Sequence, residues 1–167
     1  MPSPTATSSI SASRTDAMPA QLAFENFPAG EIVEYGAVEV TAREIVEFAR
    51  EFDPQPFHVD QVKAKAATGG LIASGWHTCA LLLRMKCDAF LSRALVLEEL
   101  GVEENRWARP VRPGDRLRVR RQTLEARPVA GAHAGEVEFL YEVVNQNGEV
   151  AMTQRVRLRL SRRGESG

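Results

Sequence analysis

The spacing of apolar residues divides this chain into two parts with different patterns. Between residues 41 and 91, apolar side chains recur every three or four positions, which is the spacing of an amphipathic helix. Beyond Gly101 they alternate with polar side chains, which is the spacing of a half-buried strand. An irregular strand or hairpin around Gly36 is expected over residues 31–40. This order of patterns predicts an α+β protein with a long helix followed by an antiparallel sheet.

Two short helices are expected before the long one. Thr41 and Glu44 have the Thr-x-x-Glu spacing of a capping box, so the first helix begins there. It ends near Phe52, because the two prolines of the following Asp-Pro-Gln-Pro segment cannot continue a helix. The second helix is expected to begin after Asp60 as its N-cap and to end at the glycine pair 69–70.

The longest helix is expected to begin at Ser74 and Gly75 and to run to about Leu91. Its apolar residues cover most of its circumference, which is typical of a helix buried at the centre of a fold. Cys79 and Cys87 lie eight positions apart on this helix, or about 12 Å along its axis. Because a disulfide requires Cα atoms within about 7 Å, both are expected to be free thiols in a reducing compartment.

The dipeptide Asn147-Gly148 predicts a hairpin in the sheet. A two-residue loop there sets one register for the strands on either side. This register puts oppositely charged pairs on one face and apolar pairs on the other: Glu136–Arg159, Glu138–Arg157, Val137–Leu158 and Phe139–Val156. Because one register satisfies both faces, the outer face is expected to be charged and the inner face apolar.

Arginines are frequent at the polar positions of the strands, and they admit two interpretations. Those between 155 and 159 favour a solvated face that the facing glutamates neutralise. Those between Arg106 and Arg121 have Asp115 as the only acid among them, so they are equally consistent with a solvated face and with binding the phosphates of a nucleotide-bearing ligand.

Length and composition exclude several classes of protein. At 167 residues and 18.4 kDa the chain has room for one domain. Its 21 basic and 22 acidic residues give a net charge of −1, which argues against a nucleic-acid-binding protein. No stretch reaches the ~18 apolar residues of a membrane span, so a cytoplasmic protein is expected. No metal-ligand spacing surrounds the cysteines, and no metal site is expected.

The two ends of the chain differ in composition from the rest. Residues 1–22 are rich in Ser, Thr and Pro, and a disordered leader is expected there. A translation start at Met18 would remove most of it. Residues 23–161 are expected to form the single domain, and residues 162–167 a flexible tail.

Polar residues between two prolines are the first candidates for chemistry. Asp53, Gln55 and His58 lie within six residues, just before the long helix. A carboxylate beside an imidazole can hold and deprotonate a water, because the carboxylate orients the ring and raises its basicity. The alternative is structural: Asp53 ends the first helix in a turn, and His58 packs beside Phe57.

The start of the long helix is the second candidate. A helix N-terminus presents free backbone N–H groups and the positive end of the helix dipole, which together suit a developing oxyanion. Gly75 would let a ligand approach the backbone closely. The alternative is that Ser74 is an ordinary N-cap and the glycines are turn residues.

Three segments together resemble the MaoC-like dehydratase family, which includes the R-specific enoyl-CoA hydratases. They are Asp53-Pro-Gln-Pro-Phe-His58-Val-Asp60, Gly70-Leu-Ile-Ala-Ser-Gly75 and Arg109-Pro-Val-Arg-Pro-Gly-Asp115. The resemblance covers about residues 25–160. It implies a hot-dog fold, in which a curved antiparallel sheet wraps one long helix. It also implies a homodimer or larger homo-oligomer with active sites near the subunit interface.

The resemblance also implies roles for individual residues. Asp53 and His58 would be the catalytic pair that holds the water for syn addition to a 2-enoyl thioester, or for the reverse dehydration. The backbone N–H of Gly75 would polarise the thioester carbonyl, and further contacts to substrate are expected from Ser74, Gln55 and Trp76. Trp76 stands where smaller residues are common in the family, so a reshaped acyl pocket is expected.

No metal or redox cofactor is implied. Coenzyme A or a carrier-bound pantetheine would arrive as part of the substrate, with its phosphates near Arg106, Arg109 or Arg112. Two other functions remain open on this fold. Thioesterases place an acid on or beside the long helix, where this chain has only Asp88. A non-catalytic, acyl-thioester-binding subunit of a heteromeric dehydratase is the other.

Overall fold

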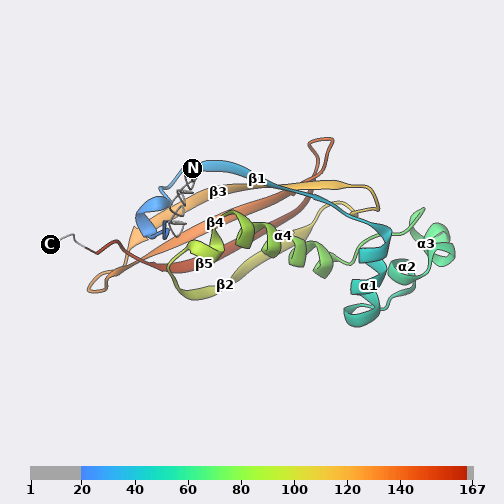
Figure 1. Ribbon diagram of the computed structural model, residues 1–167, viewed down its shortest axis with the longest axis horizontal. Coiled ribbons are helices and arrows are strands. Elements are labelled where there is room, and N and C mark those ends of the chain that lie inside the picture. Colours follow the sequence, from blue (N-terminus) through green and yellow to red (C-terminus); the bar gives the residue numbers. More distant parts are fainter. Residues whose placement is uncertain (1–19, 165–167) are drawn as a thin grey trace, which may run out of the picture.

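The computed structural model describes residues 20–164. One antiparallel sheet of five strands, in the order β1-β3-β4-β5-β2, curves around the long helix α4 (Figure 1). The helices are η1 (Phe24–Asn26), α1 (Ala42–Phe52), α2 (Pro56–Val59), α3 (Gln61–Thr68), α4 (Gly75–Ala89) and η2 (Leu91–Arg93). The strands are β1 (Ile32–Glu39), β2 (Val96–Trp107), β3 (Arg116–Pro128), β4 (Ala134–Val144) and β5 (Val150–Ser161). This is the α+β hot-dog architecture expected from the sequence.

The helix boundaries follow the capping signals closely. Thr41 accepts from the backbone N–H of Glu44, whose side chain reaches back to Thr41, so the predicted capping box is confirmed. Asp60 caps α3 through the N–H groups of Val62 and Lys63. The sequence did not predict α2, a single turn that begins at Pro56, because a proline at the first helical position starts a helix as readily as it ends one.

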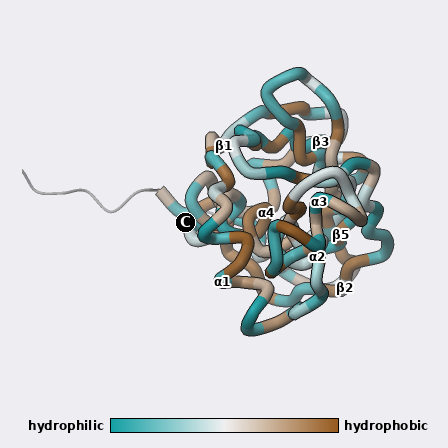
Figure 2. The backbone as a smooth tube through the Cα atoms, turned by 90° about the vertical axis from the view of Figure 1, so that its right-hand side faces the viewer, coloured by the Kyte–Doolittle hydropathy of each residue, from teal (hydrophilic) through white to brown (hydrophobic). Residues whose placement is uncertain are grey.

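The helix α4 is covered on one side only. Leu82 and Met85 on its sheet-facing side are buried, whereas Trp76 and Leu83 remain 63% and 49% exposed. Figure 2, seen from the end that carries α1–α3, shows β1, β3, β5 and β2 around one side of α4. The helix is central to the sheet, as expected, but less of its circumference is buried than its apolar residues predicted, because within residues 20–164 the sheet covers one side of it. The helix also ends at Ala89 instead of Leu91.

The predicted hairpin forms between β4 and β5 with the expected register. Glu136 pairs with Arg159, Val137 with Leu158, Glu138 with Arg157 and Phe139 with Val156. The turn itself differs from a two-residue loop: Gly148 N donates to Asn145 O, and Asn145 N donates to Glu149 O. A register shift next to Val144 then restores the predicted pairing. The strand β1 is a single strand with an irregularity between Tyr35 and Val38, not a hairpin.

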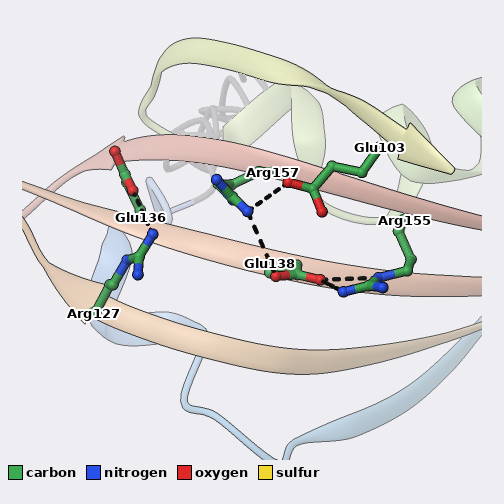
Figure 3. A network of polar contacts seen from close by, with 6 residues as sticks. All are labelled: Glu103, Arg127, Glu136, Glu138, Arg155 and Arg157. Carbon is green, nitrogen blue, oxygen red and sulfur yellow. Dashed lines mark hydrogen bonds and ion pairs between the residues drawn. The ribbon is translucent and has the colours of Figure 1, made fainter.

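The arginines of β5 form the solvated, neutralised face expected of them. Arg155 and Arg157 both pair with Glu138, and Arg157 also reaches Glu103 on β2 (Figure 3). Along β3, arginines likewise meet glutamates of the neighbouring strands: Arg116–Glu39, Arg118–Glu34 and Arg120–Glu142. For these β3 residues the structure favours the solvated face over a phosphate site.

The chain ends are described in part. Residues 1–19 and 165–167 lie outside the described residues, so the predicted leader and tail stay predictions there. Leu22 forms a parallel bridge with Ala94, and Arg162 pairs with Glu25. No helix within residues 20–164 is long and apolar enough to cross a membrane.

Candidate active site

A cleft of about 370 Å³ lies where α1 ends, α4 begins and β2 ends. Figure 1 shows α1, α2 and α3 grouped beyond the end of the sheet, at the start of α4. Five of the six predicted site residues line this cleft: Asp53, Gln55, His58, Gly75 and Trp76. The three motif segments also supply Ile72, Ala73, Arg109, Pro110 and Val111 to the wall. Three residues that the sequence did not single out complete it: Thr78, Trp107 and Ala108.

Two hydrogen-bond donors hold the Asp53 carboxylate in place. It follows the last residue of α1, and its Oδ2 accepts a hydrogen bond from Ser74 Oγ at 2.7 Å. Its Oδ1 accepts from Gln55 Nε2 at 2.7 Å. The Ser74 hydroxyl is the main cause of a lowered pKa of Asp53; burial opposes it, and Gln55 and His58 lower the pKa further. Asp53 is therefore a carboxylate at neutral pH.

His58 lies on the single turn α2 and is 5% exposed. Its Nδ1 is 2.7 Å from the carbonyl oxygen of Ile72. Because a carbonyl can only accept, Nδ1 carries a hydrogen, and in the neutral ring Nε2 is then the acceptor. The ring also packs edge-on against Phe57, with centroids 4.5 Å apart. His58 thus packs beside Phe57, as the structural alternative expected, and it also faces Asp53.

The two functional groups meet with a defined geometry. His58 Nε2 lies 3.4 Å from Asp53 Oδ2, and both line the cleft. When His58 is neutral, these are two acceptors facing one another, which a water donating one hydrogen to each would satisfy. When His58 is protonated, Nε2–H can donate to the carboxylate instead. The pair can therefore bind a water, accept its proton and hold the resulting imidazolium.

Ser74 and Gly75 stand where the sequence placed them, at the start of α4. Ser74 is the N-cap, and its Oγ accepts from Trp76 N at 3.2 Å. Ser74 is also fully buried, and its donor is used by Asp53, so its predicted contact with substrate stays a prediction. Gly75 is the first residue of the helix, where a backbone N–H has no acceptor within the helix, and it lines the cleft.

Of the three arginines expected near the phosphates of coenzyme A, only Arg109 lines the cleft. It pairs with Glu149 at 3.2 Å. Arg112 donates to the carbonyls of Thr68 and Gly70 and so braces the loop before α4. Arg106 pairs with Glu104, two positions away along β2.

Residues 24–145 match the family model described as the MaoC like domain. The chain belongs to the MaoC-like dehydratase family. A crystal structure of the MaoC-like dehydratase from Rhodospirillum rubrum is 35% identical and covers 86% of this chain and 99% of that chain, with a TM-score of 0.80. An uncharacterized Bacillus subtilis protein, YdeM, is 30% identical over 105 residues, which is 62% of this chain and 74% of YdeM.

An R-hydratase of Pseudomonas aeruginosa has the same fold, with a TM-score of 0.71 at 23% identity over 86% of this chain and 88% of that chain. Each of the three segments that carried the resemblance to the MaoC-like family contributes residues to the cleft wall, whereas Asp60 of the first segment caps α3. The acid on the long helix, Asp88, does not line the cleft; it is exposed and pairs with Arg84.

Two contributors to this MaoC-like site were missed from the sequence. The carbonyl of Ile72 fixes the tautomer of His58, and Trp107 covers the first turn of α4. Every residue has a backbone carbonyl, so the side chains in the sequence give no indication of this contact. The one signal near Trp107 is its place two positions before Arg109, where the third motif segment begins.

Proposed function

We propose that this protein catalyses the syn addition of water to a 2-enoyl thioester, or the reverse dehydration of a 3-hydroxyacyl thioester. The observation that carries the proposal is the pair of acceptors in the cleft: His58 Nε2 and Asp53 Oδ2, 3.4 Å apart, with His58 Nδ1 committed to Ile72 O. The family of the chain and its 35% identity to a MaoC-like dehydratase support the same reaction class.

The addition proceeds in two proton movements. A water held between Asp53 and His58 attacks C3 of the enoyl group and gives one proton to His58 Nε2, while the C2–C3 π electrons move toward the thioester oxygen. The Asp53 carboxylate stabilises the imidazolium and keeps the ring oriented. Nε2–H then protonates C2, which restores neutral His58. Because one group removes and returns the proton, both additions take place on the same face.

The thioester carbonyl lies at the N-terminus of α4 in this mechanism. The N–H of Gly75 donates to the oxygen on which negative charge develops, and the helix dipole adds to the attraction. A single donor of this kind contributes about 3–4 kcal/mol to stabilisation of the transition state. Coenzyme A or pantetheine is part of the substrate, and Arg109 at the cleft is the arginine best placed for its phosphates.

The decisive experiment is the loss of enoyl-thioester absorbance with purified protein, over crotonyl-CoA and branched, dicarboxylic and longer enoyl-CoAs. Asp53→Asn and His58→Gln should each lower kcat by about 10²–10⁴-fold, the usual contribution of a general base. Asp60→Asn is the matched control, because it changes the other acid of the motif and keeps an N-cap for α3. Wild-type turnover in Asp53→Asn or His58→Gln would refute the assigned role.

The same protein preparations separate the other functions. Release of free thiol from acyl-CoA would identify a thioesterase, which the position of Asp88 outside the cleft disfavours. We further propose that the active form is a homodimer; its mass in solution by light scattering tests this. Hydration seen only after co-expression with a second MaoC-like chain would instead identify a subunit of a heteromeric enzyme.

A further inference from the structure

Trp107, the last residue of β2, contacts the first turn of α4. Its Nε1–H donates to the carbonyl oxygen of Gly75 at 2.9 Å, across 32 residues of sequence. The indole also occupies the space beside Gly75: a Cβ on residue 75 would lie 2.6 Å from ring atom Cε2 and 2.7 Å from Nε1. Separations this short are not found between non-bonded atoms, so the tryptophan fits only against a glycine.

The backbone of Gly75 does not itself require glycine. Gly75 lies in a helix and is not among the glycines with positive φ, and alanine is the better helix former. The sequence suggested that this glycine admits a ligand to the backbone. The structure shows a second reason, because the neighbour that a side chain at position 75 would meet is the Trp107 indole.

We propose that Trp107 is a positioning residue for the reaction, an inference that rests on the proposed function. Its Nε1–H fixes the peptide group between Gly75 and Trp76, and thereby the first turn of α4. This turn includes the Gly75 N–H that polarises the thioester carbonyl in the proposed reaction. Terminal turns of helices lack part of their internal hydrogen bonds and fray, so a bond from a neighbouring strand restricts this one. An oxyanion donor is effective only when it is held in place before the charge develops.

The tryptophan is itself well oriented. Trp107 pairs with Met152 of β5 at the end of the sheet, and its ring meets Trp76 edge-to-face with centroids 5.4 Å apart. Both indoles line the cleft and are 46% and 63% exposed. Trp107 therefore contributes two separate features, a hydrogen-bond donor to Gly75 and an aromatic wall of the cleft. A phenylalanine at this position would keep the aromatic ring and lack the donor.

Trp107→Phe removes the hydrogen-bond donor to Gly75 and keeps an aromatic ring in the cleft wall. Loss of one hydrogen bond that aligns the oxyanion donor should lower kcat about tenfold. KM and the preference among acyl chains should change little, because the phenyl ring still closes the cleft. An unchanged kcat, or an effect confined to KM, would overturn the proposal.

A double-mutant cycle on thermal stability tests the fit between residues 75 and 107 without any substrate. Gly75→Ala should lower Tm by roughly 3–10 °C, the effect of overpacking. In the Trp107→Ala background the same substitution should leave Tm unchanged or raise it, since the obstructing ring is gone and alanine favours the helix. Equal losses of Tm in both backgrounds would refute the fit.

Gly135→Ala is the matched control for this cycle. A Cβ there would collide with the ring of Phe24, far along the sheet from Trp107, so its loss of Tm should be the same in both backgrounds. The kinetic and thermal results also separate the two proposals. If the wild-type protein turns over no enoyl thioester, the proposed function and the positioning role both fail. The double-mutant cycle on Tm still shows in that case whether the Trp107 indole packs against Gly75.

Discussion

Ser74→Ala should raise the pH at which the Asp53 carboxylate becomes protonated. Ser74 Oγ donates to Asp53 Oδ2 at 2.7 Å and is the main cause of the lowered pKa of Asp53. A hydrogen bond to a charged group contributes about 1.5–3 kcal/mol. Removing the hydroxyl withdraws this contribution from the ionised form and should therefore raise the pKa of Asp53, while Gln55 still donates to Oδ1 and limits the rise.

The direction of the shift follows from the partners of the carboxylate. A donor stabilises the ionised form, so loss of the Ser74 hydroxyl favours the protonated form and raises the pKa of Asp53. The pH–activity profile does not isolate this shift, because the proposed reaction also needs a neutral His58 ring, and an imidazole ordinarily takes up its proton at higher pH than a carboxyl. The measurement is therefore the carbon-13 chemical shift of the Asp53 carboxyl group as a function of pH.

A separate effect on stability must be distinguished from this shift. Ser74 is also the N-cap of α4, so its removal should cost about 1 kcal/mol and lower Tm by about 3 °C. Asp60→Ala removes the N-cap of α3 at a similar cost and leaves Asp53 untouched, so the titration of Asp53 in this variant should coincide with that of the wild type. If the titration of Asp53 in Ser74→Ala also stays in place, Ser74 does not control Asp53.

Two further predictions concern buried charges. Glu31→Ala should lower stability by about 2–4 kcal/mol, because it leaves the buried guanidinium of Arg121 without its carboxylate partner. Thermal unfolding measures this loss, and Arg43→Ala, which breaks an exposed pair with Glu47, should lower Tm much less. Burial lowers the pKa of His77 and the charge of Glu44 opposes it, so the unfolded chain binds more protons as the pH falls through the ordinary value of 6.5. Stability should therefore decrease as the pH falls through about 6.5. Denaturant titrations should show a smaller decrease for His77→Phe, and an equal decrease would contradict this.

Local signals in the sequence were sufficient for the elements that hold the site. The capping box at Thr41 and the N-cap at Asp60 placed two helices, and Ser74 placed the start of α4, because each signal lies within four residues of its consequence. Asp53 and His58 are five positions apart with a short turn between them, so their proximity also follows from local structure.

Contacts made across the sheet could not be predicted in the same way. Trp107 reaches Gly75 only because β2 pairs with β5 at one edge, which brings its last residue to the start of α4. The hairpin shows the same limit at shorter range. The Asn145 side chain accepts from the N–H groups of Asn147 and Glu149, and the turn starts at Asn145, one residue earlier than the Asn-Gly signal indicated.

Arg121 shows that the position of a residue in a strand is more informative than the composition of its segment. It belongs to the arginine-rich segment 106–121, but it is in phase with Leu117 and Val119, the inward residues of β3. The structure buries it to 5% exposure, with its guanidinium about 5 Å from the rings of Phe27, Phe90 and Phe139. The alternation of a strand therefore determines which face a charged residue lies on, even when that face is buried. An arginine in phase with the core requires a nearby carboxylate and aromatic rings, and Glu31, which pairs with it, comes directly before β1, the strand that neighbours β3.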